Sequence, residues 1–349
     1  MKLTSYLLLL LIPTAALAGY WRVAIVETDA KLLEPFGVDF DQSGAMYVIE
    51  YGGHRLIRVK NGHAEVVAGN GQKGFAGDGG PAAKAQLNSP HSIAVAASDD
   101  VYIADSFNCR VRRIDAKSGI ISNFAGTGQK SFGGDGGPAE KAQFGNIYCV
   151  AFDPKFERMY LADLDNRRIR AIDMKSGIVN TVAGNGQKGV PKDREAAKDQ
   201  PLVDPRAVAA DSRGNVYILE RSGNALRVVD AAGKIKTVAG TGRAGYSGEE
   251  GPALKATLNG PKHLCVYGNG VLIADTENHV IRQYKADDGS IERVMGTGKE
   301  GAKFHEGGGE CELSRPHGVF VRRGLFKDQI YVADSENNRI LKLTWVASP

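Results

Sequence analysis

Hydrophobic and polar positions alternate along this chain in short runs, and the runs recur with a period of about 56 residues. Apolar stretches rich in Val, Ile and Tyr are separated by Gly, Asn, Asp and Ser, which is typical of β-strands joined by turns. In the second unit the runs fall at residues 93–95, 101–105 and 110–114. A fourth run ends in Val-Ala-Gly, as at 182–184. The pattern therefore predicts four antiparallel strands in each unit.

Six such units begin at Pro35, Pro90, Asn146, Pro205, Pro261 and Pro316. Four-stranded units repeated around an axis form a β-propeller. The sixth unit lacks a fourth strand of its own, and residues 21–26, ahead of the first unit, are a candidate to supply it. Pairing the two termini removes exposed strand edges. The pattern predicts an all-β, six-bladed propeller, closed by the N-terminal strand, as a single domain over residues 19–349.

The first 18 residues have a different character. Lys2 precedes an apolar run at 6–12, and Ala16-Leu17-Ala18 follows. This order indicates a secretory signal peptide over residues 1–18, cleaved after Ala18. The run is shorter than the ~20 residues that span a bilayer. We therefore expect a secreted or periplasmic protein without a transmembrane anchor.

Charge and cysteine content narrow the picture further. The net charge is only +4 over 349 residues, and Lys and Arg are spread along the chain, which argues against nucleic acid as a partner. None of the four cysteines forms a C-x-x-C pair, so a structural zinc site of the usual spacing is excluded. Export permits disulfides. Two alternatives stay open, the pairs Cys109–Cys149 and Cys265–Cys311, or four free thiols. We expect a monomer.

The sixth unit carries the most regular motif. It reads P-x-G-V, then hydrophobic-Tyr-Val-Ala-Asp-x-x-Asn-x-Arg-Ile, ending with Asp334, Asn337 and Arg339. This pattern resembles the NHL repeat, and units two and three match it equally well. The resemblance implies the six-bladed propeller fold. NHL propellers include ligand-binding scaffolds, protein-interaction modules and a few enzymes, so the fold leaves the function open.

In a propeller, the first strand of each blade is innermost, and its start lies on the same face as the end of the second strand. The residues after each blade-opening proline therefore converge at the channel mouth: Phe36, His91, Arg206, Lys262 and His317. An acidic residue ends each second strand: Glu50, Asp105, Asp163, Glu220, Asp275 and Asp334. These acids are interpreted mainly as turn structure, bonding amides and the Arg that follows. One or two could instead bind a cation such as calcium, and we place Asp105, Asp163, Asp275 and Asp334 on the candidate binding face.

Three histidines carry the alternative, catalytic interpretation. His91 and His317 occupy equivalent positions, and His263 lies one residue further along its unit. Three imidazoles can hold zinc with an open fourth position. The Pro-His context resembles that of the peptidyl-α-hydroxyglycine α-amidating lyases, which implies a zinc-dependent lyase, and Arg206 is suited to hold a carboxylate. The shift of His263 turns its side chain to the other face of the strand. Polar residues that simply line the channel are the plain alternative.

Long glycine-rich connectors, such as residues 69–87, precede the later blades. They lack the Gly-Lys-Ser/Thr of a phosphate loop. We interpret them as a turn and a short helix starting at Pro81, Pro138 or Pro252, with Asp78 and its equivalents bonding free amides. Connectors of about 20 residues on one face form a rim where a ligand can dock. The first hypothesis is a non-catalytic scaffold that binds a protein, a small molecule or a carbohydrate there. The alternative is a zinc-dependent lyase or hydrolase.

Overall fold

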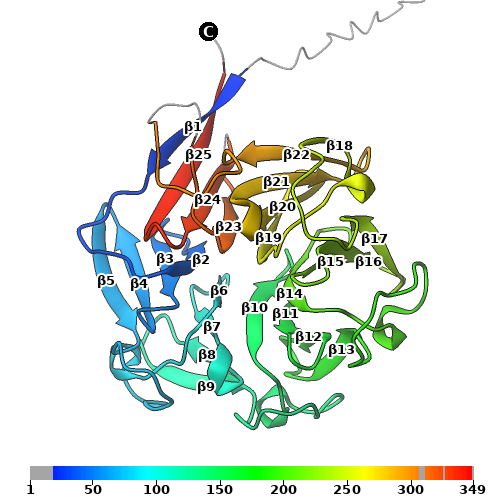
Figure 1. Ribbon diagram of the computed structural model, residues 1–349. Helices are drawn as coiled ribbons and strands as arrows, with labels where there is room; N and C mark the ends of the chain where they lie inside the picture. The colour runs from blue at the N-terminus through cyan, green and yellow to red at the C-terminus, as the bar shows by residue number, and fades with distance from the viewer. Residues whose placement is uncertain (1–18, 306–310, 325–326, 348–349) are drawn as a thin grey trace, which may run out of the picture.

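The computed structural model describes residues 19–305, 311–324 and 327–347. Its strands form six antiparallel sheets arranged as blades around a central axis (Figure 1). The predicted six-bladed, all-β propeller is confirmed. The predicted signal peptide lies outside the described residues. Within the described ranges, no helix is long and apolar enough to cross a membrane.

The first three blades hold four strands each, which follow one another from the axis outward. Blade one consists of β2 (Pro35–Phe40), β3 (Met46–Glu50), β4 (Arg55–Lys60) and β5 (His63–Ala68). Blade two consists of β6 (Ser92–Val95), β7 (Val101–Asp105), β8 (Arg110–Ile114) and β9 (Ile121–Ala125). Blade three consists of β10 (Ile147–Phe152), β11 (Arg158–Asp163), β12 (Arg168–Asp173) and β13 (Val179–Ala183).

The last three blades follow the same order with two variations. Blade four consists of β14 (Pro205–Ala210), β15 (Val216–Glu220), β16 (Ala225–Val229) and β17 (Ile235–Ala239). Blade five consists of β19 (His263–Tyr267), β20 (Gly270–Asp275), β21 (Val280–Lys285) and β22 (Ser290–Met295), with the short β18 (Glu250–Pro252) added outside β22. Blade six consists of β23 (Gly318–Arg322), β24 (Gln329–Asp334), β25 (Arg339–Ala347) and β1 (Gly19–Ile25).

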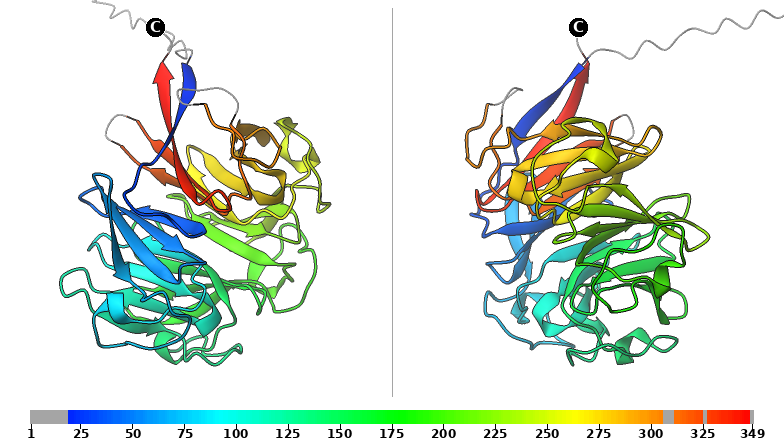
Figure 2. Two further views of the ribbon diagram at one scale, coloured as in Figure 1. Left: turned by 60° about the vertical axis from the view of Figure 1, so that its left-hand side comes forward. Right: turned by 45° about the vertical axis from the view of Figure 1, so that its right-hand side comes forward.

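The N-terminal strand closes the ring, as the sequence predicts. β1 pairs antiparallel with β25, placing Trp21 opposite Trp345. The two indole rings meet edge to face at 5.3 Å. The ribbon of β1 and β25 extends beyond the rest of blade six, so both ends of the described chain leave the ring together (Figure 2). Closure joins strands that are more than 300 residues apart, so the six blades form one continuous unit.

Apolar side chains that alternate along the strands pack between neighbouring blades. One buried cluster joins Tyr160 of blade three to Val208 and Ile218 of blade four and Leu264 of blade five. The repeated Val-Ala-Gly has a backbone reason. Gly184 has φ = 91°, and a Cβ there would lie 2.1 Å from the Arg167 carbonyl oxygen. Only glycine fits at that turn, so the motif recurs at the end of the outer strands.

The connectors form single 3₁₀ turns rather than longer helices. These are η1 (Ala82–Lys84), η3 (Ala139–Lys141), η4 (Ala197–Asp199) and η5 (Ala253–Lys255). Two further turns, η2 (Ser106–Asn108) and η6 (Thr276–Asn278), follow the second strands of blades two and five. Pro81, Pro138 and Pro252 stand at the N-cap instead of the first helical position. Each of these connectors also bridges to the outer strand of the next blade, as Pro81 does to Ile120, which partly covers that edge.

The connector acids differ from expectation in their partners. Asp78 pairs with the guanidinium of Arg112 at 2.7 Å, and Asp135 pairs with Arg170 at 2.7 Å. Both arginine side chains have no exposed surface. The glycine-rich stretch is therefore structural, as predicted, but its acid neutralises a buried arginine of the blade rather than capping a helix.

Candidate functional site

The channel through the propeller has two different ends. Inner strands begin at one end, where the long connectors and the turns after the second strands also lie. We call this end the connector face. Inner strands end at the opposite side, which we call the turn face. A cavity of about 310 Å³ opens at the connector face and one of about 720 Å³ at the turn face.

All six blades contribute to the smaller cavity, which we call the mouth pocket. It is lined by Glu34, Phe36, Tyr51, His91, Phe107, Tyr148, Arg206, Arg221, Lys262, Arg315, His317, Ser335 and Glu336. The five residues predicted from the blade-opening positions, Phe36, His91, Arg206, Lys262 and His317, are all among them. The pocket divides into an aromatic half, formed by blades one to three together with His317 of blade six, and a cationic half from blades four to six.

Stacked rings form the aromatic half. Phe36 stacks on Tyr51 with centroids 4.5 Å apart and on His317 at 3.9 Å, with interplanar angles of 7° and 9°. His91 meets Tyr148 edge-on at 4.3 Å and Phe36 at 5.3 Å. Such mutual packing holds each ring in place and leaves a rigid, largely apolar wall.

Both histidines of the mouth pocket have a defined tautomer. His91 Nδ1 lies 2.8 Å from the Ser89 carbonyl oxygen, and His317 Nδ1 lies 2.9 Å from that of Arg315. A carbonyl only accepts, so Nδ1 carries the hydrogen and Nε2 is left as an acceptor. Burial lowers the pKa of both imidazoles well below the usual value, and the positive charges of Arg206 and Lys262 lower it further. The two rings are therefore neutral at pH 7.

Three of the four cations of the mouth pocket have carboxylate partners. Arg221 pairs with Asp204 at 2.9 Å. Lys262 and Arg315 each lie 2.8 Å from Glu277, and Arg315 also pairs with Glu336 at 2.9 Å. Burial lowers the pKa of Lys262 to about 8, although Glu277 opposes the shift. These pairs hold the rim of the pocket together and neutralise most of its charge.

Arg206 is the exception. Its exposed fraction is 4%, yet no ion pair to it is found among the described residues. One long hydrogen bond of 3.3 Å runs from its Nη1 to the Tyr148 carbonyl, and the guanidinium lies 4.4 Å from the Tyr148 ring centroid. The buried Nε has no hydrogen-bond partner. Burial lowers the pKa of Arg206 to about 10, so the side chain is charged at pH 7 without a counter-charge.

His263 does not join the other two histidines, so the predicted zinc triad is wrong. Its side chain lines the turn-face cavity, with Nδ1 3.1 Å from the Val319 carbonyl and the ring against Phe320. Because successive side chains of a strand point to opposite faces, the shift by one residue turns the His263 side chain away from the face that His91 and His317 use. Among the described residues, no three His, Cys, Asp or Glu side chains are grouped to hold a metal ion.

The acids Asp105, Asp163, Asp275 and Asp334 are not on the binding face. Their exposed fraction is 0%, and they do not line the mouth pocket. Each accepts a hydrogen bond from a backbone amide just before its inner strand, as Asp105 does from Asn88 at 2.7 Å. Burial raises the pKa of Asp105 to about 6 against these bonds. These four acids therefore have a structural role, because each one binds the end of a connector to its blade.

Their arginine partners also differ from the prediction. Arg339 pairs with Asp334 at 2.7 Å, as expected from the motif. In blade two, however, the partner of Asp105 is Arg112 and not the motif residue Arg110. Arg110 instead donates to the Gly126 carbonyl at 2.8 Å. Strand alternation explains the change, because positions two apart share a face and either can reach the acid.

All four cysteines are free in the structure, which decides between the two alternatives and rules out the proposed pairs. Cys109, Cys149 and Cys311 are buried, and Cys265 is half-buried. Burial raises the pKa of Cys149, and that of Cys265 to about 12. These thiols are therefore held protonated and unreactive.

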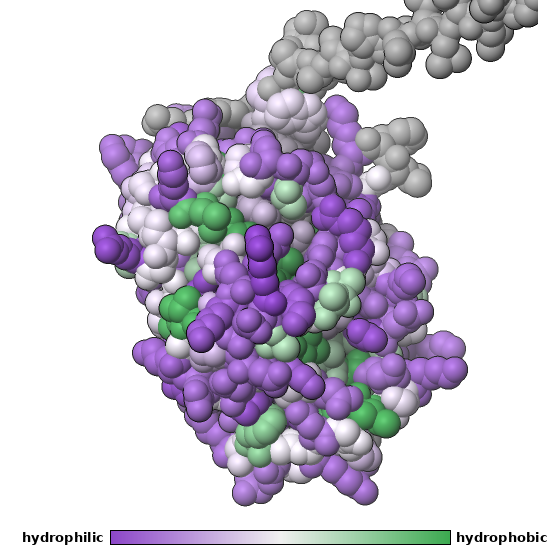
Figure 3. All heavy atoms as spheres, turned by 90° about the vertical axis from the view of Figure 1, so that its right-hand side faces the viewer, coloured by the Kyte–Doolittle hydropathy of each residue, from purple (hydrophilic) through white to green (hydrophobic). Residues whose placement is uncertain are grey.

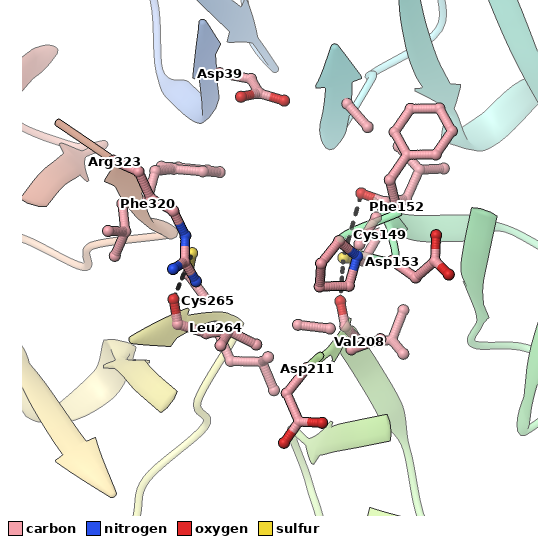
Figure 4. A pocket seen from close by; sticks show the side chains of 18 of the residues that line it. Asp39, Cys149, Phe152, Asp153, Val208, Asp211, Leu264, Cys265, Phe320 and Arg323 are labelled. Carbon is pink, nitrogen blue, oxygen red and sulfur yellow. Dashed lines mark hydrogen bonds between the residues drawn. The ribbon is translucent and has the colours of Figure 1, made fainter. Parts of the chain in front are cut away.

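The turn-face cavity, which we call the turn pocket, is larger, but none of the buried side-chain nitrogen and oxygen atoms of its described lining lacks a hydrogen-bond partner. The side chains labelled in Figure 4 surround an open centre and come from blades one, three, four, five and six. Asp39 accepts the amides of Val95 and Phe40 at 2.7 and 2.8 Å. Asp211 accepts four groups from its own turn, including Arg213 at 3.1 Å. Asp39 therefore binds amides of β6 and of its own strand β2, and Asp211 stabilises the turn that follows it.

Several lining residues of the mouth pocket were not among those predicted from the sequence. Tyr51 and Arg221 directly follow the acid of the second strand, and Phe107 and Glu336 follow it by two. The signal was present in the repeat. The acid recurs in every blade for a structural reason, whereas the next two positions change from blade to blade, as a site requires.

The family of the chain follows from its repeats. The family model described as the teneurin NHL domain matches residues 56–133 and 139–245, which is more than half of the chain. The chain belongs to this NHL family. The NHL-repeat resemblance seen in the sequence is thereby confirmed.

Curated relatives are larger proteins. Over 280 residues the chain is 27% identical to Protein SUPPRESSOR OF QUENCHING 1, chloroplastic, of Arabidopsis thaliana, covering 76% of this chain and 26% of that protein. It is 23% identical to NHL repeat-containing protein 2 of Gallus gallus, covering 89% of this chain and 46% of that protein. The chain thus spans less than half the length of these relatives.

Solved structures with the same fold include binding proteins and enzymes. An auxiliary nutrient binding protein from Bacteroides thetaiotaomicron VPI-5482 has a TM-score of 0.68 and 14% identity, covering 94% of this chain and 77% of that one. The virginiamycin B lyase of Staphylococcus aureus has a TM-score of 0.57 and 12% identity, covering 93% and 100%. At these identities the likeness shows the fold alone, so function has to be argued from the pocket.

Proposed function

We propose that this NHL propeller is an exported binding protein that takes a small molecule in the mouth pocket. The observation that carries the proposal is Arg206, a buried cation that lines this cavity without a counter-charge. Buried charges are normally paired, because an unpaired charge is costly to desolvate. A buried cation without a partner, in a pocket on the axis of the propeller, therefore indicates a ligand site.

The architecture supports the same location. The pocket volume of about 310 Å³ lies at the lower end of the range for small-molecule sites. Its walls combine the rings of Phe36, Tyr51, Phe107 and Tyr148 with a larger set of charged and polar groups, so the pocket is more polar than most small-molecule sites and suits a ligand that carries a charge. The rings and ion pairs already pack against one another, so the pocket is formed before a ligand arrives and little ordering entropy is lost on binding.

A docking surface for a protein is the other form of the scaffold hypothesis. Figure 3 shows one side of the molecule, where hydrophilic residues dominate and apolar residues lie in small separate patches. A stable protein interface ordinarily has an apolar centre. We favour the mouth pocket because it holds the buried, unpaired charge of Arg206. Export, in line with the N-terminal leader pattern, supplies the compartment.

The test is a fragment screen by thermal shift and NMR on the purified protein, followed by two matched variants. Tyr51→Ala truncates a ring of the mouth pocket, and Phe152→Ala truncates a ring of the turn pocket. We expect hits whose affinity falls in Tyr51→Ala and is kept in Phe152→Ala. The opposite pattern, or the absence of any hit in a chemically broad set, would overturn the proposal.

A second candidate function is an acid–base lyase in the same pocket. It is favoured by the neutral imidazoles of His91 and His317, whose Nε2 atoms are available as bases beside a fixed cation. This form of the lyase hypothesis needs no zinc triad. Incubation of a bound fragment with the protein, followed by mass spectrometry, separates the two functions. Turnover that is lost in His91→Gln would make the protein an enzyme, and an unchanged ligand supports the binding protein.

A further inference from the structure

We infer that the ligand of the mouth pocket is a carboxylate monoanion attached to a flat, largely apolar body, with the carboxylate bound by Arg206. This inference rests on the proposed function and specifies its ligand class. It follows from charge balance, from the donors left free on one side chain, and from the division of the pocket into two halves.

The charge balance selects a single negative charge. Arg221, Lys262 and Arg315 are matched by the ion pairs with Asp204, Glu277 and Glu336. The remaining acid of the rim, Glu34, is exposed and stays solvated. Among the described residues of this pocket, Arg206 is the buried cation whose charge no carboxylate balances. One uncompensated positive charge in a buried setting is neutralised by one negative charge, so a monoanion fits and a phosphate dianion would leave its second charge unmatched.

The donors of Arg206 point to a carboxylate. Its guanidinium makes only the long bond to the Tyr148 carbonyl, and Nε has no partner. The Nε of Arg315 in the same pocket is also without a partner, but the rest of that guanidinium is bound by Glu277 and Glu336. A guanidinium has five N–H donors in a planar fork that matches the two oxygens of a carboxylate. Buried donors of this kind are nearly always bonded in folded proteins. A bound carboxylate is the group that completes the hydrogen bonding of this side chain.

Electrostatic effects within the pocket agree with an anion. The positive charge of Arg206 contributes to the lowered pKa of His91, His317 and Lys262. These three bases of the pocket thus sense a positive potential. A cationic ligand would meet the same repulsion, although the aromatic rings alone would suit one. The aromatic half is therefore assigned to the neutral body of the ligand.

The aromatic half of the pocket sets the shape of that body. The stack of Tyr51, Phe36 and His317 and the edge-on ring of Tyr148 form its wall. Aromatic walls favour flat bodies through stacked and edge-to-face contacts. The cavity of about 310 Å³ limits this body to one ring or a short unsaturated chain. Benzoate has both features and is the probe we choose.

The experiment measures benzoate binding by calorimetry or ligand-observed NMR, with benzamide as the neutral analogue of the same shape. Inorganic phosphate and glucuronate test the charge and the body of the ligand. Charged hydrogen bonds of this type correspond to about 10–100-fold in affinity. We expect benzoate to bind at least about tenfold more tightly than the other three probes.

Variants assign the binding to the side chain. Arg206→Met should weaken benzoate binding by about 10–100-fold and leave benzamide unchanged, because Met keeps the apolar stem but has no donor. Arg323→Met removes an equal charge at the turn pocket and should have no effect. Circular dichroism and the thermal midpoint establish that both variants are folded.

The outcomes separate this inference from the proposed function. Equal binding of benzoate and benzamide, lost in Tyr51→Ala, would leave the mouth pocket as the site and overturn the carboxylate assignment. Tighter binding of phosphate or glucuronate than of benzoate would overturn it as well. Benzoate binding that responds to Arg323→Met or Phe152→Ala, and not to Arg206→Met, would overturn both.

Discussion

The two ends of the channel use the same residue types for different purposes. At the turn face, Asp39 accepts hydrogen bonds from strand amides and Asp211 accepts them from amides of its own turn. The larger cavity at this face has no unmatched buried donor among its described lining residues. At the connector face, Arg206 is buried without a carboxylate. The comparison shows that cavity size is a poor guide to a site, whereas an unsatisfied charge is a specific one.

The same contrast exists between two buried arginines of blade four. Arg227 is bound by the carboxylate of Glu220 at 2.7 Å, and both side chains are almost fully buried. Arg206, at the start of the same blade, has no such partner among the residues that the structure describes. Arg227 is therefore part of the structure of the blade, and Arg206 is available for a ligand.

The largest expected effect is on the structural arginine. Glu220→Ala leaves Arg227 buried without its counter-charge and removes the acceptor for the Val203 amide. We expect a loss of about 3–5 kcal/mol in the free energy of unfolding, measured with urea. Asp230→Ala is the control, because this exposed acid only bonds amides of its own turn at the other end of the blade. It should cost about 1 kcal/mol or less. Equal losses would contradict the role given to the buried pair.

The second prediction concerns the stability of Arg206→Met. This change removes a desolvated charge, one long hydrogen bond and the contact of the guanidinium with the Tyr148 ring, which the thioether of Met partly replaces. The free energy of unfolding should therefore stay the same or rise by about 1 kcal/mol. The matched change Arg227→Met should lower the free energy of unfolding by about 3–5 kcal/mol, because it leaves the carboxylate of Glu220 buried without its counter-charge. Both are measured by urea unfolding. A large loss in Arg206→Met would show that Arg206 is structural after all.

The third prediction is a pH dependence of benzoate binding. Lys262, with a pKa of about 8, lies beside Glu277 and Arg315 at the rim of the mouth pocket. It is charged below pH 8 and loses its proton above, so affinity for the anion should fall several-fold between pH 7 and pH 9. Arg206, with a pKa of about 10, stays largely charged in this range. The lowered pKa values of His91 and His317 keep both imidazoles neutral throughout. Calorimetry at three pH values measures the effect, and Lys262→Met should remove it.

The smallest expected effect is the reactivity of the native thiols. Cys149 and Cys265 line the turn pocket, but burial raises the pKa of both. A thiol reagent at pH 8 should label the native protein only slowly and should reach all four cysteines in denaturant. A result of two or fewer thiols after denaturation without a reducing agent would show that disulfides exist.

Much of the fold could be predicted from the sequence because the same pattern of strands and turns recurs in six units. The blade-opening residues and the Val-Ala-Gly turns recur at fixed spacing, and the missing fourth strand of the last blade indicated the closing strand. The candidate site was predicted only in part. Phe36, His91, Arg206, Lys262 and His317 converge as their repeat positions require. The zinc triad failed at His263, because a shift of one residue reverses the direction of a strand side chain.

What the sequence alone determined is the architecture and the mouth positions, since both depend on local spacing that repeats along the chain. What only the tertiary structure decided is which charged groups find partners. Asp105 is a candidate ligand by its position in the sequence, yet its carboxylate is occupied by the Asn88 amide and the guanidinium of Arg112. Arg206 differs from the other mouth cations in having no carboxylate partner among the described residues. That difference depends on distances between blades, which no single segment of the chain encodes.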